Sequence, residues 1–274
     1  MADHDGATKS HPADQLVDAI ASSRSPACVG LDPVWERLPA SLREHDDQAA
    51  AIAQYCLLVL DAVKDHVPAV KIQSACFERY GAAGAAVRDG VVTAARRHGL
   101  VTILDAKRGD IGISAEHYAV GAFGHEHAAD WITVNAYLGA DGLEPFLARG
   151  GAFALVRTSN PGGDALQQMK LENGRTVAEY VAYLMAELGD STIGQSGYSA
   201  LGAVVGATKA DEAMTLRRIM PRQIFLVPGV GAQGGDVEAL RGIFDEDGQG
   251  ALITASRSVI YAFDDDQADW QAAV

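Results

Sequence analysis

Residues 103–112, ILDAKRGDIG, hold the densest group of side chains that could do chemistry. Asp105 and Lys107 are two residues apart at the end of an apolar run, so in a strand both side chains would point to the same side. An ammonium group beside carboxylates stays protonated, because opposite charges stabilise its charged form, and can act as a fixed cation and proton donor. Asp110 adds a second carboxylate from the following loop.

Two more charged residues lie near the ends of neighbouring apolar runs. Asp32 follows the first run in GLDP, and Lys71 lies near the end of the next run, 69–72. An isolated D-x-K pair is most often a structural salt bridge. Here charges from three runs would meet at one rim, and buried charge at that density is costly unless function requires it. We therefore predict a charged functional site made of these residues together with Asp105 and Lys107.

A glycine-rich segment, VPGVGAQGGD, occupies residues 227–236. Its glycines spell G-x-G-x-x-G, a pattern that also opens dinucleotide-binding domains. That interpretation does not fit, because many strand and helix signals come first and the acidic residues Asp245 and Glu246 fall short of the usual spacing of about 20 residues. A phosphate site formed by backbone N–H groups after a barrel strand fits better.

The residues expected at this phosphate site are Pro228, Gly229, Gln233, Gly234 and, after the next apolar run, Arg257. The Gln233 side chain offers an amide donor. The planar guanidinium of Arg257 can hold a phosphate through two parallel hydrogen bonds. An exposed arginine at a strand end is the alternative for Arg257, and the neighbouring glycine loop makes that alternative weaker.

The turn RTSNPGG brings Ser159 and Asn160 to the same rim, where they could contact the polar edge of a ring. Asn-Pro also forms turns without binding anything. A hydrolase nucleophile is disfavoured because the chain has no G-x-S-x-G elbow. Residues 160–175 are polar, glycine-rich and longer than most connections. They predict a mobile lid or a surface insertion, and their place after a strand end favours the lid.

Short apolar runs alternate with helix-like stretches, which predicts βα units. The runs are 27–31, 69–72, 101–104, 131–134, 153–156, 201–205, 224–227 and 251–253. The helix-like stretches are 48–64, 81–98, 114–123, 142–148, 177–188, 211–220 and 237–244, with an extra helix at 13–23. Thr176 and Glu179 have capping-box spacing, and Asp211 and Asp236 are placed to cap helices. A chain of 274 residues with eight runs predicts one α/β domain, a (β/α)8 TIM barrel over 13–274 behind a flexible tail at 1–12.

The amino-acid composition disfavours some classes of binding partner. The chain has 22 Lys and Arg against 36 Asp and Glu, a net charge of −14, so it should repel nucleic acids and anionic membranes.

Cys28, Cys56 and Cys76 lie apart in apolar runs, which predicts buried free thiols in a reducing compartment. Without a signal peptide or a membrane-length apolar run, a cytoplasmic protein is expected. The GHEH segment at 124–127 should lie at the far end of the barrel, so no metal role is expected there.

The motifs GLDP, DAKRGDI, TSNPG, PGVGAQGGD and SRS occur in this order and together resemble the orotidine 5′-phosphate decarboxylase family. The longer bacterial branch is most similar, because VNAYLG at 134–139 follows its V-N-x-Y-L-G pattern. The resemblance covers nearly the whole chain. It implies decarboxylation of orotidine 5′-monophosphate to uridine 5′-monophosphate in pyrimidine biosynthesis, without a cofactor or metal, by a homodimer with shared active sites.

The resemblance also implies the chemical roles. Lys107 would protonate the carbanion at the sixth pyrimidine carbon, and Asp105 would lie against the departing carboxylate. Asp110 would reach into the partner's site across the dimer interface. Ser114 stands where the family usually has threonine, and it keeps the hydroxyl for a ribose contact. Ala136 replaces a proline of the family turn.

The binding roles follow from the same resemblance. Asp32 and Lys71 would bind ribose hydroxyls and complete the charge array. Ser159 would contact the pyrimidine amide, Gln233 and Arg257 would hold the phosphate, and the segment from residue 160 onward would close as the lid.

Two other functions remain open. Metal-dependent sugar-phosphate decarboxylases or aldolases of the same barrel type resemble the D-x-K-x-x-D pattern, but they place an acidic metal ligand on the second strand, where this chain has Lys71. A cation there should repel Mg²⁺. The other alternative is a non-catalytic barrel that binds phosphonucleotides, which would not need Lys107.

Overall fold

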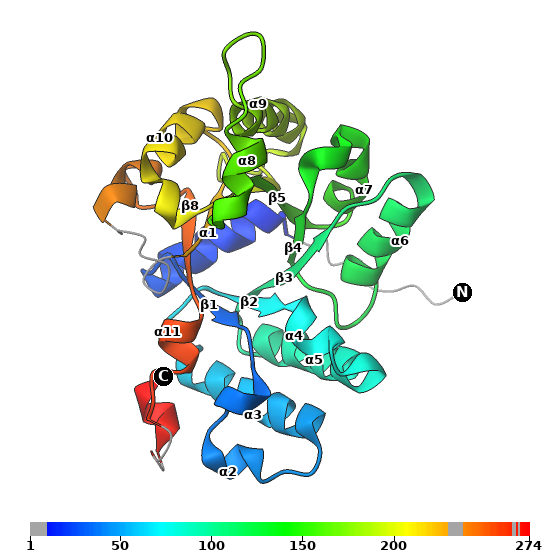
Figure 1. The fold of residues 1–274 in the computed structure, drawn as a ribbon, viewed down its shortest axis with the longest axis vertical. Coiled ribbons are helices and arrows are strands. Elements are labelled where there is room, and N and C mark those ends of the chain that lie inside the picture. Colours follow the sequence, from blue (N-terminus) through cyan, green and yellow to red (C-terminus); the bar gives the residue numbers. More distant parts are fainter. Residues whose placement is uncertain (1–9, 230–237, 265–266, 268) are drawn as a thin grey trace.

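Eight parallel strands close into a barrel in the computed structural model, which describes residues 10–229, 238–264, 267 and 269–274. The strands pair in chain order, and the last returns to pair with the first (Figure 1). They are β1 Ala27–Leu31, β2 Ala69–Gln73, β3 Val101–Arg108, β4 Trp131–Val134, β5 Gly151–Arg157, β6 Leu201–Val205, β7 Phe225–Pro228 and β8 Ala251–Ala255. The predicted (β/α)8 barrel is confirmed, and each apolar run overlaps one strand.

Helices surround the barrel on the outside (Figure 1). They are α1 Pro12–Ser23, α2 Ala40–Arg43, α3 Gln48–Val63, α4 Ser74–Glu78, α5 Gly81–Arg97, α6 Gly112–Phe123, α7 Glu144–Leu147, α8 Asp164–Gln167, α9 Val177–Gly189, α10 Ala210–Ile219 and α11 Arg257–Ile260. The capping box is confirmed at the start of α9, where the Thr176 hydroxyl accepts from the backbone N–H of Glu179 and the Glu179 carboxylate accepts from that of Thr176.

Two of the helix expectations were wrong in detail. Asp211 does not cap α10. The 3₁₀ turn Ala207–Lys209 runs directly into the helix, so the helix begins at Ala210 and Asp211 lies in its first turn. The stretch expected to be a helix between β7 and β8 contains the 3₁₀ segment Glu238–Ile243 instead. The Asp236 cap lies outside the described residues.

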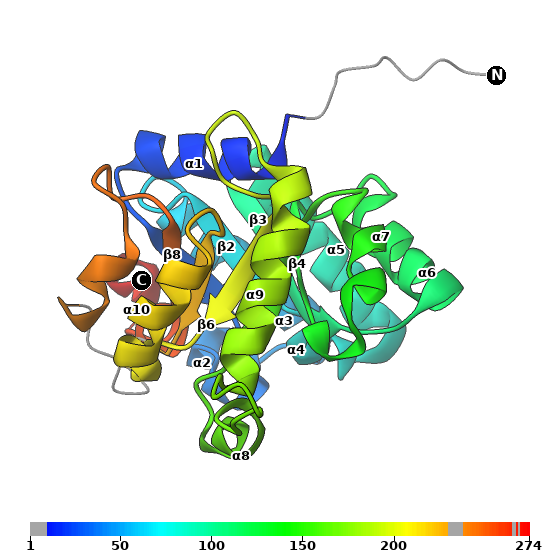
Figure 2. The same cartoon turned by 90° about the horizontal axis from the view of Figure 1, so that it is seen from above.

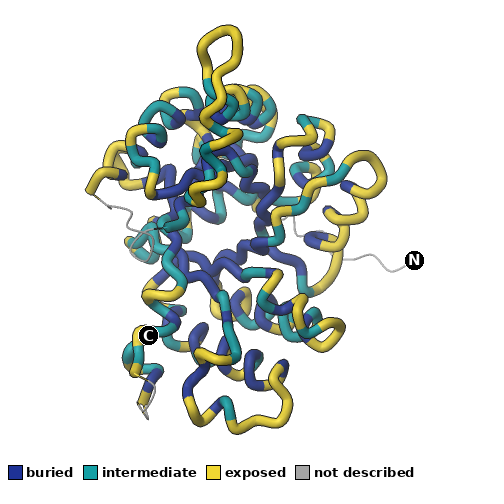
Figure 3. Tube along the Cα trace, viewed as in Figure 1, coloured by how far each residue is buried: buried dark blue, intermediate teal, exposed yellow. Residues whose placement is uncertain are grey.

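The extra helix α1 covers the end of the barrel where the strands begin. Its buried residues Ala13, Leu16 and Ile20 pack in one apolar cluster with Trp131 and Phe153 inside the barrel. Figure 2 shows α1 and α8 at opposite ends of the molecule. A second, larger cluster lies between the strands and the outer helices, so the buried trace forms a ring inside exposed connections (Figure 3). One end of the barrel is therefore filled by apolar packing, and the other is left for polar side chains.

The remaining sequence expectations concern thiols and histidines. Cys28 and Cys56 are buried, Cys76 is half-buried, and all three are free. Burial raises the pKa of Cys28 to about 12 and that of Cys76 to about 11, which keeps both as thiols. The GHEH segment precedes β4, at the end covered by α1. No helix within the described residues has the length and apolar character needed to cross a membrane.

Candidate active site

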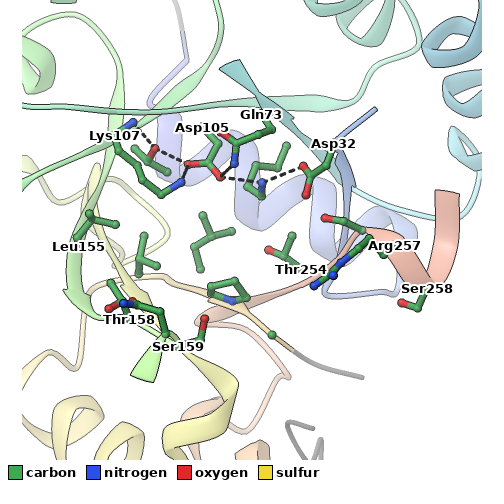
Figure 4. A pocket seen from close by; sticks show the side chains of 18 residues that line it. Asp32, Gln73, Asp105, Lys107, Leu155, Thr158, Ser159, Thr254, Arg257 and Ser258 are labelled. Carbon is green, nitrogen blue, oxygen red and sulfur yellow. Dashed lines mark hydrogen bonds and ion pairs between the residues drawn. The ribbon is translucent and has the colours of Figure 1, made fainter. Parts of the chain in front are cut away.

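A cavity of about 400 Å³ opens at the carboxyl ends of the strands, the end where barrel enzymes place their active sites. Nine of the residues predicted from the sequence line it: Asp32, Lys71, Asp105, Lys107, Ser159, Asn160, Pro228, Gly229 and Arg257. Figure 4 shows Asp32, Asp105 and Lys107 along one wall, with Thr158 and Ser159 on the opposite wall and Arg257 between them. The cavity is thus charged on one side and neutral on the other.

The charged wall alternates acids and lysines across three strands. Lys71 Nζ lies 2.8 Å from Asp105 Oδ2 and 3.5 Å from Asp32 Oδ1. Lys107 Nζ lies 2.6 Å from Asp105 Oδ1. The predicted contact between Asp105 and Lys107 is therefore present, and Lys71 joins it to Asp32 in one row of charges.

Asp105 is almost fully buried and accepts four side-chain hydrogen bonds. Lys71 and Gln73 donate to Oδ2, at 2.8 and 3.1 Å, and Lys107 and Thr133 donate to Oδ1, at 2.6 and 2.8 Å. Burial alone would raise the pKa of this carboxyl, but the charges of Lys71 and Lys107 outweigh burial and hold the pKa well below its usual range. Asp105 is a fixed anion at any physiological pH.

Lys71 is the buried cation of the row. Burial acts to lower its pKa, but Asp105 and then Asp32 reverse that effect, so its pKa lies above the ordinary lysine value. Removing one partner of such a buried pair leaves an uncompensated charge, which costs about 3–5 kcal/mol of stability. In contrast, the Lys107 side chain is 47% exposed. Lys107 is the cation of the pair that reaches into the cavity.

Lys107 reaches this position through an irregular backbone rather than the regular period of a strand. It has a φ of +48°, one of two non-glycine residues in the left-handed region among those described, which costs about 1–2 kcal/mol. The pairing of β3 with β4 also shifts between Leu104 and Arg108. The sequence argument placed Lys107 on the correct side, but the bulge that aims it was not expected.

The far wall carries the groups proposed for the ring and the phosphate. Leu155, Val204 and Leu226 add apolar lining to the cavity, and Arg257 begins α11 immediately after β8. Gly229 has a φ of +97°, a conformation that favours glycine directly after β7. Gln233 and Gly234 lie outside the described residues, so their predicted phosphate contacts stay a prediction.

The polar segment after β5 is tied to the barrel by a buried arginine. Arg157, with no exposed surface, contacts Asp164 at 2.6 Å and Glu212 at 2.5 Å. The amide of Gln167 pairs with Thr158, accepting from its N–H at 2.9 Å and donating to its hydroxyl at 2.9 Å. The segment predicted to be a mobile lid or a surface insertion therefore contains the short helix α8, anchored at its base beside Ser159 and Asn160.

Asp110 and Ser114 do not line the cavity of the single chain. Asp110 is half-buried and accepts the backbone N–H of Ile111, while Ser114 is exposed at the start of α6. Large apolar side chains are exposed on the same part of the surface: Ile111 56%, Ile113 68%, Tyr137 76% and Leu138 45%. These two predicted site residues thus belong to an outer face and not to the cavity.

Sequence reasoning missed several polar residues that line or support the site, among them Gln73, Thr133 and Arg157. Gln73 stands two residues after Lys71, so the period-two rule used for Asp105 and Lys107 could have placed it in the lumen. Thr133 lies within an apolar run and gave no signal by residue type. Arg157 looked like an ordinary charged residue before a turn. Its burial depends on two carboxylates, Asp164 and Glu212, one of them far along the chain.

Comparison with known proteins places this chain in a family. The sequence model of the family described as "Orotidine 5'-phosphate decarboxylase / HUMPS family" matches residues 25–273. A protein of Rhodopirellula baltica named orotidine 5′-phosphate decarboxylase is 42% identical, over 96% of this chain and 94% of its own length. One of the same name from Deinococcus radiodurans is 43% identical, over 91% of this chain and 89% of its own.

A solved structure agrees with these sequence matches. The structure of Leishmania donovani OMP decarboxylase superimposes with a TM-score of 0.75 at 31% identity, covering 96% of this chain and 94% of that one. The sequence and structural matches extend over nearly the whole barrel, including the charged wall. The chain therefore belongs to the orotidine 5′-phosphate decarboxylase / HUMPS family.

Proposed function

We propose that this protein decarboxylates orotidine 5′-monophosphate (OMP) to uridine 5′-monophosphate (UMP) in pyrimidine biosynthesis. The observation that carries the proposal is the row Asp32, Lys71, Asp105 and Lys107 at the mouth of the barrel. It sets a half-exposed ammonium against a fixed carboxylate, which is the arrangement needed to protonate a carbanion. The named relatives at 42–43% identity support the same reaction.

In the proposed reaction the bond between the sixth ring carbon and the carboxylate carbon breaks, and its electron pair stays on the ring carbon. Carbon dioxide leaves, and the proton of Lys107 Nζ forms the new carbon–hydrogen bond; solvent later returns a proton to the amine. The negative charge develops chiefly in the transition state, so a cation fixed nearby by Asp105 lowers the barrier selectively. No cofactor is needed for these steps.

The remaining lining residues are proposed to hold the substrate. Asp32 and Lys71 would bind the ribose hydroxyls, and Ser159 with Asn160 would contact the pyrimidine amide, with the apolar wall under the ring. Arg257, Pro228 and Gly229 at the end of β7, together with Gln233 and Gly234 further along the sequence, would bind the phosphate. Binding energy from the phosphate can be used to close the site over the reacting carbon.

The segment that contains α8 is proposed to act as the lid. It begins at Asn160, on the cavity wall, and most of its side chains are exposed. A closing segment would exclude water and strengthen the electrostatic contacts inside. Its anchors at Arg157 and Gln167 would keep its base in place while its tip moves.

A homodimer with shared active sites is the proposed assembly. The exposed apolar side chains Ile111 and Ile113 follow Asp110 in the chain, and Tyr137 and Leu138 are exposed after β4. Together they provide the kind of surface that another copy would cover. Asp110 and Ser114 would then enter the partner's cavity. A cytoplasmic location is proposed as well, supported by the three free thiols.

The purified chain should convert OMP to UMP without any additive, followed by the loss of OMP's ultraviolet absorbance. The rival function is a metal-dependent enzyme of the same barrel type. Because Lys71 occupies the strand-two position expected of an acidic metal ligand, EDTA should leave the rate unchanged. Activity that is lost on EDTA and restored by Mg²⁺ would favour the rival.

A further inference from the structure

Thr133 on β4 makes a pair of hydrogen bonds that joins the two central residues of the charged wall. Its hydroxyl donates to Asp105 Oδ1 at 2.8 Å and accepts from the backbone N–H of Lys107 at 2.9 Å. The residue is 1% exposed and lines the cavity. One buried hydroxyl therefore contacts both the carboxylate and the main chain of the lysine to which that carboxylate is paired.

The bond to Lys107 falls where the strand pairing is interrupted. Leu104 pairs with Ile132 and Arg108 with Val134, so β3 advances four residues while β4 advances two. Lys107 lies within this bulge, with its φ of +48°. A non-glycine residue keeps such a conformation only when its surroundings fix it. The Thr133 hydroxyl is a side-chain acceptor that does so from the neighbouring strand.

The second bond holds the other half of the pair. Asp105 Oδ1 accepts from Thr133 and from Lys107 Nζ, whereas Gln73 and Lys71 occupy Oδ2. One atom, the Thr133 hydroxyl oxygen, thus holds both the carboxylate of Asp105 and the backbone of Lys107. It thereby sets the place at which the Lys107 ammonium meets the substrate. Valine has the same shape as threonine but neither donates nor accepts, while serine keeps both functions.

We propose that Thr133 is a positioning residue of the decarboxylation, which holds the backbone of Lys107 and the carboxylate of Asp105 in register so that the lysine proton is delivered to the ring carbon. The inference rests on the proposed function. It concerns the geometry of proton delivery and not the affinity for nucleotide, so it predicts an effect on kcat rather than on KM.

Thr102 offers a matched control on the adjacent strand. It is also fully buried, and its hydroxyl also donates to a carboxylate, that of Asp130, at 2.8 Å. It lies at the start of β3, away from the cavity. A purely structural role for buried threonine hydroxyls would make Thr102→Val and Thr133→Val behave alike.

The test measures kcat and KM for OMP, UMP affinity and thermal stability in the parent, Thr133→Val, Thr133→Ser and Thr102→Val. We expect Thr133→Val to lose about 10²-fold in kcat, the usual effect of misplacing a reacting group by about an ångström, with KM and UMP affinity within about threefold of the parent. Thr133→Ser should recover most of the rate. Thr102→Val should lose stability to a similar extent but keep kcat within about twofold.

The inference fails if Thr133→Val keeps the parent kcat, if it changes only KM, or if Thr102→Val loses as much rate. Should Thr133→Val not fold, Thr133→Ser and Thr133→Ala form a second pair that differs in the hydroxyl alone, and equal rates for the two would overturn the proposal. An inactive parent would instead refute the proposed function and is distinguishable from all of these results.

Discussion

At the scale of single residues, the charged wall depends on Asp105, whose two carboxylate oxygens both accept hydrogen bonds from neighbouring side chains. All of its hydrogen-bonding partners are donors, two on each oxygen, so protonation of the carboxylate would break favourable contacts. Lys71 is buried and paired on both sides, while Lys107 is the half-exposed cation. Lys71 therefore balances the buried negative charge, whereas Lys107 is the cation that can meet a substrate.

Lys107→Ala should separate an enzyme from a nucleotide-binding protein. Removing a general acid typically costs about 10²–10⁴-fold in rate, so kcat for OMP should fall by at least that much. Affinity for UMP, measured by calorimetry, should stay within about threefold, because the proposed phosphate and ribose contacts do not use this side chain. A variant that turns over OMP like the parent would show that Lys107 is not the proton donor.

Asp105 should make folding stability depend on pH in acid. Its folded-state pKa lies below that of the unfolded chain, so the unfolded chain takes up the proton first as the pH falls. The stabilisation is present above about pH 4 and is lost as the pH falls below that value. Urea unfolding between about pH 5 and 2 should show a shallower loss for Asp105→Asn than for the parent. Equal slopes would contradict the assignment.

At the scale of elements, the anchors of α8 link the proposed lid to the cavity wall. Gln167→Ala removes two hydrogen bonds to Thr158, each worth about 0.5–1.5 kcal/mol. If that energy holds the lid base in the binding position, KM for OMP should rise about tenfold. The neighbouring Gln168, whose side chain donates a hydrogen bond of 3.2 Å to Glu212 Oε1 and none to Thr158, provides the control. Equal KM values for Gln167→Ala and Gln168→Ala would argue against this anchor.

Helix α1 should contribute to stability without affecting catalysis. Leu16 is fully buried against the apolar cluster at the closed end of the barrel. Leu16→Ala should cost about 2–5 kcal/mol in the free energy of unfolding, from lost burial and a residual cavity. Because the active site is at the other end, kcat at a temperature where the variant is folded should match the parent. A large fall in kcat would show coupling between the two ends.

The elements and the cavity differ in how far sequence could predict them. Strands were placed to within a few residues because buried parallel strands form short, continuous apolar runs. The side chains on the charged wall were found by their charge, although Lys107 reaches the wall through a bulge and not through the strand period assumed for it. The details missed, such as the bulge at Lys107, the hydroxyl of Thr133 and the burial of Arg157, depend on neighbours distant in the chain. No local pattern contains that information.

At the scale of the whole molecule, the proposed assembly gives a prediction that a monomeric site would not. Asp110→Ala and Lys107→Ala should each be inactive, but a mixed dimer would contain one intact site, with Lys107 from one copy and Asp110 from the other. Random exchange between the two variants should restore roughly a quarter of the parent activity per protomer. Mixing after unfolding and refolding, with each variant treated alone as the control, measures this. No gain on mixing would contradict shared sites.

Helix α1 and the cavity lie at opposite ends of the barrel, and this arrangement has a practical consequence. The chain enters α1 at Pro12, on the sealed base of the barrel, whereas nucleotide would enter through the rim near α8 (Figure 2). A linker joined ahead of Pro12 would therefore attach the protein to a support through the end opposite the cavity. Immobilised in this way, the protein could be supplied with fresh nucleotide in continuous flow without steric obstruction from its support.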